Sequence, residues 1–133
     1  MPAPATHLAI DRRLCGEPVA IDDGSATVAL VTLPEMAADD RGLVHGGFVF
    51  GLADYAAMLA VNHPNVVLGS AETRFLKPVR VGERLVAKAN VEESDGRKSR
   101  VRVEVRRGEE AVMSGAFACF TLERHVLDTG GKA

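Results

Sequence analysis

One stretch of the chain combines residues that can polarise a carbonyl group with a residue that can attack it. His45, Gly46 and Gly47 come just before a long apolar segment, and Asp54 lies inside that segment. Glycine amides at the start of a helix are open to a ligand and lie at the positive end of the helix dipole, where a developing oxyanion is favoured. The carboxylate of an aspartate can act as a nucleophile or as a general base. The pattern therefore indicates attack on a carbonyl, while the glycines are equally typical of a tight turn.

Asp54 is an unusual residue for its setting. No lysine or arginine lies within four residues of it in either direction, so no ion pair along a helix accounts for it. Aspartate is disfavoured inside helices and is rarely buried without a partner. We therefore expect a functional reason for Asp54. His45 can either orient a ligand or complete the turn before the helix, and the sequence leaves both open.

The spacing of Gly46 and Asp54 limits how they can act together. They are separated by 54 − 46 = 8 residues, which is ~12 Å along a helix axis. An attacking group and an oxyanion donor must meet within ~3 Å of one carbonyl. Two subunits related by a two-fold axis can satisfy this requirement by sharing two sites. Joint action of these residues therefore predicts a homodimer.

The elements that position these residues can be predicted along the chain. The segment 42–62 runs from a glycine- and histidine-containing turn into one helix that is apolar on almost every face, which predicts a helix buried all round. Asp22-Asp23-Gly24 and Asp95-Gly96 are hairpin signals between strand-like runs. We expect strands over 14–21, 25–33, 66–78, 83–93, 98–107 and 111–122.

Six strands joined by short turns, with one helix after the second strand, predict an α+β fold. Short turns make neighbouring strands antiparallel. A helix that is apolar all round needs covering from more directions than a flat sheet offers, so the sheet must curl around it. We expect one domain over residues 1–133, with a core at about 14–122 and frayed tails at 1–7 and 128–133.

Composition narrows the class of function. The net charge of −2 argues against binding of nucleic acid through phosphate neutralisation. The first residues lack the pattern of a secretory leader, and the apolar helix is too short and interrupted to span a membrane, so we expect a cytoplasmic protein. Cys15 and Cys119 lack metal-site or redox-motif spacing and are predicted to be buried thiols. No metal ligand set is expected.

These residues also carry a resemblance to a known family. His45-Gly46-Gly47 followed by Leu52-Ala53-Asp54, in this order of elements, resembles the hotdog-fold thioesterases of the phenylacetate-pathway and 4-hydroxybenzoyl-CoA groups. Residues 74–79 and Gly82-Glu83 are also similar to that family. The resemblance implies a curved six-stranded antiparallel sheet wrapped around one helix and dimers that often pair into tetramers. It also implies hydrolysis of acyl-CoA thioesters without a metal or redox cofactor, CoA being part of the substrate.

The resemblance also implies roles for single residues. The Gly46 amide would polarise the thioester carbonyl, with His45 and Gly47 forming the turn, and Asp54 of the partner subunit would be the nucleophile or general base. Met58 would line the acyl pocket together with nearby aromatic residues. Ser70 or Thr73 would position a water molecule. Which acyl group is bound, and whether the assembly is a dimer or a tetramer, are left open by the sequence.

Two further positions bear on substrate binding. Asp39 stands where many members of the family have an asparagine or glutamine that helps to hold substrate, and a second carboxylate there opposes catalysis unless it is protonated, paired with Arg41 or turned away. Arg97 and Lys98, at a turn, are the first candidates to bind the phosphates of CoA. The alternative to a thioesterase is a non-catalytic protein that binds acyl-CoA or regulates in response to it.

Overall fold

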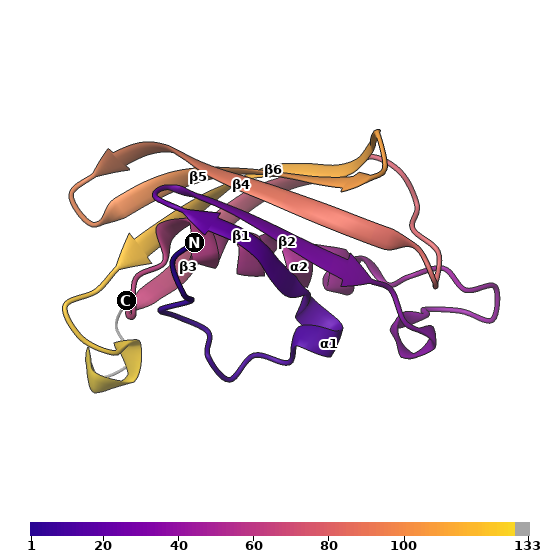
Figure 1. The fold of residues 1–133 in the computed structure, drawn as a ribbon, viewed down its shortest axis with the longest axis horizontal. Helices are drawn as coiled ribbons and strands as arrows, with labels where there is room; N and C mark the ends of the chain where they lie inside the picture. The colour runs from indigo at the N-terminus through magenta and orange to yellow at the C-terminus, as the bar shows by residue number, and fades with distance from the viewer. Residues whose placement is uncertain (130–133) are drawn as a thin grey trace.

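A computed structural model of the chain, which describes residues 1–129, has one long helix lying against a curved antiparallel sheet (Figure 1). The predicted order of two strands, a long helix and four strands is confirmed, as is the hotdog architecture. The elements in chain order are α1 (Arg12–Cys15), β1 (Glu17–Asp22), β2 (Ser25–Val31), η1 (Pro34–Met36), α2 (Gly46–Val61), β3 (Val66–Phe75), β4 (Arg84–Asp95), β5 (Lys98–Arg107), β6 (Glu110–Thr121) and η2 (Val126–Thr129).

The strands form one six-stranded sheet in the order β1-β2-β4-β5-β6-β3. Every neighbouring pair is antiparallel, and the chain passes under the sheet as α2 between β2 and the opposite edge strand, β3. Both predicted Asp-Gly hairpins are present, with Gly24 at φ 79° and Gly96 at φ 62°, values that favour glycine. Two connections therefore cross the described sheet: the segment that contains α2, from β2 to β3, and the segment 76–83, which returns from β3 to β4.

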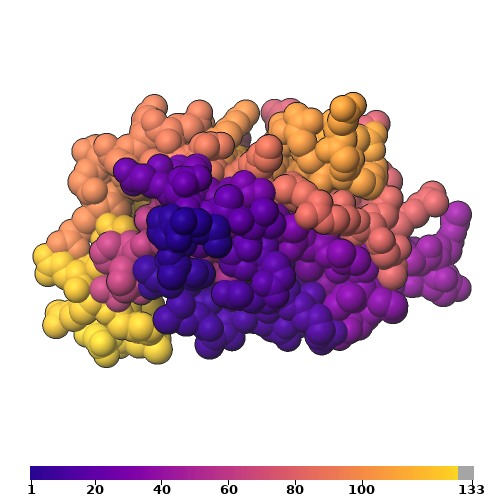
Figure 2. All heavy atoms as spheres, viewed as in Figure 1, coloured from indigo at the N-terminus to yellow at the C-terminus, as the bar shows by residue number. Residues whose placement is uncertain are grey.

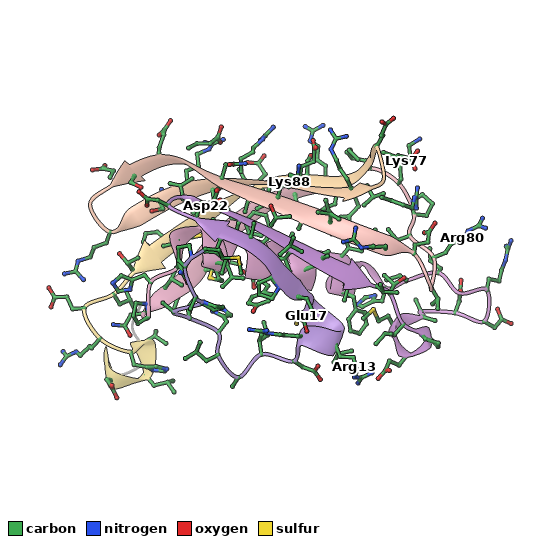
Figure 3. The ribbon with its side chains drawn as sticks, viewed as in Figure 1. Arg13, Glu17, Asp22, Lys77, Arg80 and Lys88 are labelled. Carbon is green, nitrogen blue, oxygen red and sulfur yellow. The ribbon has the colours of Figure 1, made fainter. Side chains whose placement is uncertain are left out.

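The core lies between α2 and the inner face of the sheet. Val101, Val103 and Val105 alternate with charged residues along β5 and are fully buried beneath the sheet. The helix contacts all six strands. Lys88 and many other charged side chains lie on the outer face, away from the helix (Figure 3). The alternation read from the sequence therefore assigns the two faces of the sheet correctly.

Both ends of α2 follow from local chemistry. The helix begins at Gly46, after His45 in an extended conformation, and ends at Val61. Asn62 follows in the left-handed conformation, with φ 50°, and its N–H donates to the carbonyl of Met58 at 2.7 Å. Asparagine is one of the few residues other than glycine that tolerates this conformation. The helix is buried from Tyr55 to Ala60, but it is not buried all round, because Gly47 is exposed and Asp54 half-buried.

The N-terminal segment differs from the prediction of a frayed tail. Its residues 3–10, which we call the strap, lie along the lower side of α2 (Figure 1) and on the surface beside β1 (Figure 2). The Ala5 N–H donates to Asn62 Oδ1, and Thr6 is buried. A helical turn, α1, then replaces the expected beginning of a strand at Leu14, because Asp11 caps it by accepting the N–H of Arg13. No local pattern in residues 1–16 indicates these long-range contacts.

The C-terminal tail was predicted to be frayed from residue 128. Asp128 and Thr129 belong to the short helix η2, and the Asp128 N–H donates to the carbonyl of His125 at 2.9 Å. Residues 130–133 lie outside the described part of the chain, so the prediction is untested there. Within residues 1–129, no helix is both long and apolar enough to cross a membrane.

The two edge strands of the sheet differ. At one edge, β1 is six residues long, contains Pro18, and shifts register against β2 between Pro18 and Ala20. At the other, β3 is ten residues long, shifts register against β6 between Leu68 and Ser70, and pairs on one side only, as far as the described residues show. Its sequence has no proline between Val66 and Phe75.

Candidate active site

The start of α2 presents two free amides. The first N–H groups of a helix have no acceptor within the helix, and no described residue accepts those of Gly46 or Gly47. His45 makes no capping hydrogen bond with its side chain; its imidazole lies over Gly47, where an added Cβ would stand 3.0 Å from ring atoms. The space needed by the His45 ring therefore explains Gly47, and the Gly46 amide remains available to an oxyanion.

Phe75, at the end of β3, lies beside this amide. Its ring is 3.6 Å from the position of a Cβ on Gly46, and its side chain is 55% exposed. Both residues line a small apolar cavity of about 170 Å³. The other lining residues are Leu43, Val44, Val49, Lys77, Pro78, Val79 and Val112. Lys77 lies at the end of the molecule at which α2 begins (Figure 3).

Asp54 is the unpaired carboxylate that the sequence singled out. Its Oδ1 is buried and has no hydrogen-bond partner within the described chain. Burial raises the pKa of Asp54 to about 6. One turn earlier, Gly51 has open space where a Cβ would stand. Asp54 therefore combines a desolvated oxygen with a position on the open part of the helix, which suits a group that must change protonation state near neutral pH.

The charge of Asp54 affects the pKa values of two nearby thiols, Cys15 and Cys119. Burial is the main cause that raises the pKa of Cys15, and it raises the pKa of Cys119 to about 12; the charge of Asp54 adds to both shifts. Cys119 is buried, as predicted, whereas Cys15 is half-buried, and both are free. Neither thiol is a nucleophile under these conditions. No group of three or more potential metal ligands occurs among residues 1–129.

Asp39 is used by its own loop. Its Oδ1 accepts the N–H groups of Arg41 at 2.9 Å and Leu43 at 3.1 Å. This arrangement is the local turn that aspartate side chains form with the next residues. The loop leads to Val44, whose N–H donates to the carbonyl of Val79 at 2.8 Å. Asp39 thus holds the approach to α2, and its carboxylate pairs with backbone amides and not with the Arg41 side chain.

Three other predicted residues lie away from the helix start. Met58 is 1% exposed and lines none of the cavities found in the described part of the chain, so it is placed in the core. Thr73 is half-buried, and its methyl group lies close over Gly115 of β6. Ser70 is exposed on β3. Neither hydroxyl forms a hydrogen bond with the buried Oδ1 of Asp54 in the described part of the chain.

Arg97 and Lys98 do not act as one pair. Arg97 forms an ion pair with Glu123, whereas the ammonium of Lys98 has no partner among the described residues. Lys98 lines a groove of about 580 Å³ that runs from the ends of β4 and β5 at their shared turn to the middle of β6 and β3. The other lining residues are Ser70, Ala71, Glu72, Glu93, Asp95, Arg100, Ala116, Phe117 and Ala118.

Six of the predicted site residues fall at two ends of the molecule, whereas Asp54, Met58 and Ser70 lie between them. Asp39, His45, Gly46 and Gly47 lie where β2 ends and β4 begins, since the His45 N–H donates to the carbonyl of Met36. The β4–β5 turn with Arg97 and Lys98 lies at the opposite end (Figure 1). Phe75 was missed by the sequence analysis; an aromatic residue just before Leu76-Lys77-Pro78 at a strand exit was the available signal.

Comparisons with known proteins agree with this architecture. The model of the thioesterase superfamily matches residues 41–114. A protein of Aquifex aeolicus named methylthioribose-1-phosphate isomerase is 55% identical over 112 residues, which are 84% of this chain and 25% of that protein. Transcription factor FapR of Shouchella clausii is 34% identical over 87 residues, which are 65% of this chain and 46% of FapR. This chain thus spans about a quarter of the length of the Aquifex aeolicus protein and just under half of the length of FapR.

Among solved structures, an uncharacterized protein of Pyrococcus horikoshii has 57% sequence identity and a TM-score of 0.94, covering 96% of this chain and 98% of that one. The matched segment 41–114 contains the helix start, Asp54 and Phe75. Fold, motif and family model therefore agree, and the chain belongs to the thioesterase superfamily, with the hotdog fold.

Proposed function

We propose that the protein is an acyl-CoA thioesterase that hydrolyses a CoA thioester to a free acid and CoA. The observation that carries this proposal is the carboxyl group of Asp54, on the open part of an otherwise apolar helix, with a buried oxygen that has no hydrogen-bond partner among residues 1–129. A group in this state is costly to the fold and is typical of sites where a charge is used in chemistry. Membership of the thioesterase superfamily supports the same reaction.

In the proposed reaction, the Gly46 N–H donates to the thioester oxygen and stabilises the negative charge that develops on it. Asp54 either attacks the carbonyl carbon, giving a mixed anhydride that water then hydrolyses, or takes a proton from a water molecule that attacks directly. In both routes the C–S bond breaks and CoA leaves as its thiol after protonation. Both routes require the ionised carboxylate. CoA is the leaving group, and the proposal involves no metal or redox cofactor.

The proposal requires two subunits. The first turn of α2 and Asp54 lie on one straight helix, with eight residues from Gly46 to Asp54, or ~12 Å, so one chain cannot bring both to one carbonyl. The unpaired edge of β3 supports assembly with a second copy, because an open strand edge offers a row of hydrogen-bonding groups. We therefore propose a homodimer with two shared sites, in which dimers can pair further.

The nucleotide end of CoA needs cations. We propose that phosphates of CoA bind Lys98, which has no ion pair within the described part of the chain. Arg97 can join it after giving up its ion pair with Glu123. They lie at the opposite end of their own chain from Gly46. In a two-fold dimer the far end of one subunit can lie beside the helix start of the other.

The catalytic role is tested by replacing Asp54 with asparagine, which keeps the shape and removes the negative charge. We expect Asp54→Asn to lower kcat for a cleaved acyl-CoA by a factor of about 100 or more. The matched control is Asp22→Asn, an exposed change at the last residue of β1, which leaves kcat unchanged. An Asp54→Asn protein that folds, assembles and hydrolyses thioesters at the normal rate contradicts the proposed role.

Sharing of the site is tested by mixing two inactive variants. Gly46→Pro removes the N–H at the first helical position, where proline is well tolerated, and His45 before it already has an extended conformation. A mixed dimer of Gly46→Pro and Asp54→Asn subunits contains one intact site, so unfolding and refolding the mixture should restore about a quarter of the normal rate. A mixture that stays inactive while forming mixed dimers contradicts a site shared between subunits.

The second candidate function is a non-catalytic sensor of acyl-CoA. It is favoured by the 34% identity to transcription factor FapR, of which this chain matches under half. This function predicts that CoA esters raise the Tm of the protein while no thioester is cleaved above the background rate. Hydrolysis of any CoA thioester that stops in Asp54→Asn excludes it.

A further inference from the structure

The strap contacts α2 at Tyr55 and Asn62, beside the point where the open face of the helix ends. This face runs through Gly47, Gly51 and Asp54, and Met58 continues it by one more helical turn. Gly51 has open space around the position of a Cβ, whereas Met58 is fully buried. The open face therefore stops directly beyond the carboxylate that is proposed to act on the substrate.

A small set of contacts holds the strap on the closed half of the helix. The Ala5 N–H donates to Asn62 Oδ1 at 2.8 Å, and Asn62 Nδ2 donates to the carbonyl of Ala3 at 3.1 Å. The His7 ring lies against that of Tyr55, with 6.2 Å between the ring centroids. One side chain, that of Asn62, thus provides both hydrogen bonds between the strap and the end of the helix.

The strap is also locally strained. His7 has φ 55°, a left-handed conformation that costs a residue with a Cβ on the order of 1 kcal/mol. Leu8, the next residue, is one of the most exposed apolar side chains of the protein. Segments held by few buried contacts open at a lower free energy than the core does. Release of the strap uncovers the face of the Tyr55 ring against which His7 lies.

We propose that the docked strap sets the length of the acyl chain that the active site accepts. The inference rests on the proposed function, because it takes the thioester carbonyl to be held beside Asp54. A short acyl group fits in the open part of the helix face. A long chain needs the apolar surface at Tyr55, the part of which beneath His7 is accessible only after the strap has left. The strap is thus a specificity-determining segment for the acyl group.

The experiment uses variants of Asn62 that keep the end of the helix intact. Asn62→Gly removes both hydrogen bonds to the strap and retains a residue suited to the left-handed conformation. Asn62→Asp is the matched control, because its carboxylate still accepts the Ala5 N–H but cannot donate to the Ala3 carbonyl. Hydrogen exchange of the strap amides reports whether the strap has left. Values of kcat/KM are measured for saturated acyl-CoAs from acetyl-CoA to palmitoyl-CoA.

We expect the wild-type protein to prefer short chains. In Asn62→Gly, strap amides exchange faster and the ratio of kcat/KM for palmitoyl-CoA to that for butyryl-CoA rises by about tenfold or more, the usual worth of a changed apolar pocket. Asn62→Asp gives a smaller rise. If Asn62→Gly does not fold, His7→Gly provides the second variant, since it suits the left-handed backbone and removes the ring that lies on Tyr55.

The outcomes separate this inference from the proposed function. Faster exchange of the strap with an unchanged chain-length profile overturns the inference and leaves the thioesterase proposal standing, as does equal cleavage of both chain lengths by wild type. If the protein binds CoA esters without cleaving them, the inference requires the Kd values to show the same preference for short chains and the same shift in Asn62→Gly. Absence of both binding and cleavage for every ester overturns the function together with the inference.

Discussion

The two halves of α2 have similar apolar compositions but different surroundings. The first half carries Gly46, Gly47, Gly51 and Asp54 and remains partly open, whereas residues 55–60 are 2% exposed or less. The second half is covered partly by the strap, which the chain supplies from its own N-terminal segment. The difference shows that an apolar helix can be completed by its own chain at one end and leave the other end to a substrate or a second copy.

The largest expected effect concerns the closed half. Met58→Ala should lower the free energy of unfolding by about 2–5 kcal/mol, because it leaves a cavity beneath a fully buried position. Urea denaturation gives the value, and Leu8→Ala, at an exposed position in the strap, is the control with little change. A loss below about 1 kcal/mol for Met58→Ala means that this half of the helix is not closed in solution.

The second prediction uses the pKa of Asp54 in the open half. Burial raises this pKa to about 6, and the proposed reaction needs the ionised carboxylate. The rate of thioester hydrolysis should therefore be constant above pH 7 and fall about tenfold per pH unit below pH 6. The measurement is kcat/KM between pH 4 and 8 with the stability of the protein checked at each pH. A rate of hydrolysis that stays constant down to pH 4 contradicts the proposed role of Asp54 in the reaction.

The third prediction concerns stability at the same residue. Folding raises the pKa of this carboxyl group from 3.8 to about 6. Its contribution to the free energy of unfolding is therefore fully present below pH 3.8 and is lost as pH rises through 6. Asp54→Asn, which stays neutral, should therefore exceed wild type in stability at pH 8 by about 1 kcal/mol, after allowance for the partly open setting. The two proteins should be equal near pH 3.5. Equal stability at pH 8 contradicts a desolvated carboxylate.

The smallest expected effect tests whether another subunit packs on the open half of the helix. Gly51→Ala should stabilise the protein by about 0.5–1 kcal/mol, because alanine is favoured over glycine inside a helix and nothing lies within 4 Å of the new methyl group. Urea denaturation at a protein concentration low enough to keep subunits apart gives the value. A loss of stability that appears only at high protein concentration means that a second copy packs on Gly51.

Most of the fold was predictable because its signals are local. The alternation of valines with charged residues in 101–106 and the Asp-Gly turns define strands and hairpins without knowledge of the rest of the chain. The segment 14–16 was wrongly assigned to a strand, since the cap at Asp11 and the left-handed Gly16 depend on how the turn packs against the helix. Local patterns fix element types but not what an N-terminal segment lies against.

The candidate site was predictable in its types of residue and less so in their surroundings. Asp54 was identified correctly as an unpaired carboxylate because no neighbour in sequence can pair with it. Asp39 was expected beside the substrate, but its carboxylate binds the backbone of its own loop. Met58 was expected in an acyl pocket and lies in the core. The last two depend on how the loop folds back and on what covers the helix, and neither is encoded in residue spacing.

The unequal edges of the sheet have a consequence for solubility at high concentration. A sheet with two long open edges can add copy after copy and grow into a fibre. Here β1 is only six residues long and its Pro18 lacks an N–H, so this edge is a poor template for another strand. Only β3 offers a long ladder. Pairing through β3 therefore uses up the one good edge of each copy, and growth by edge addition ends at two.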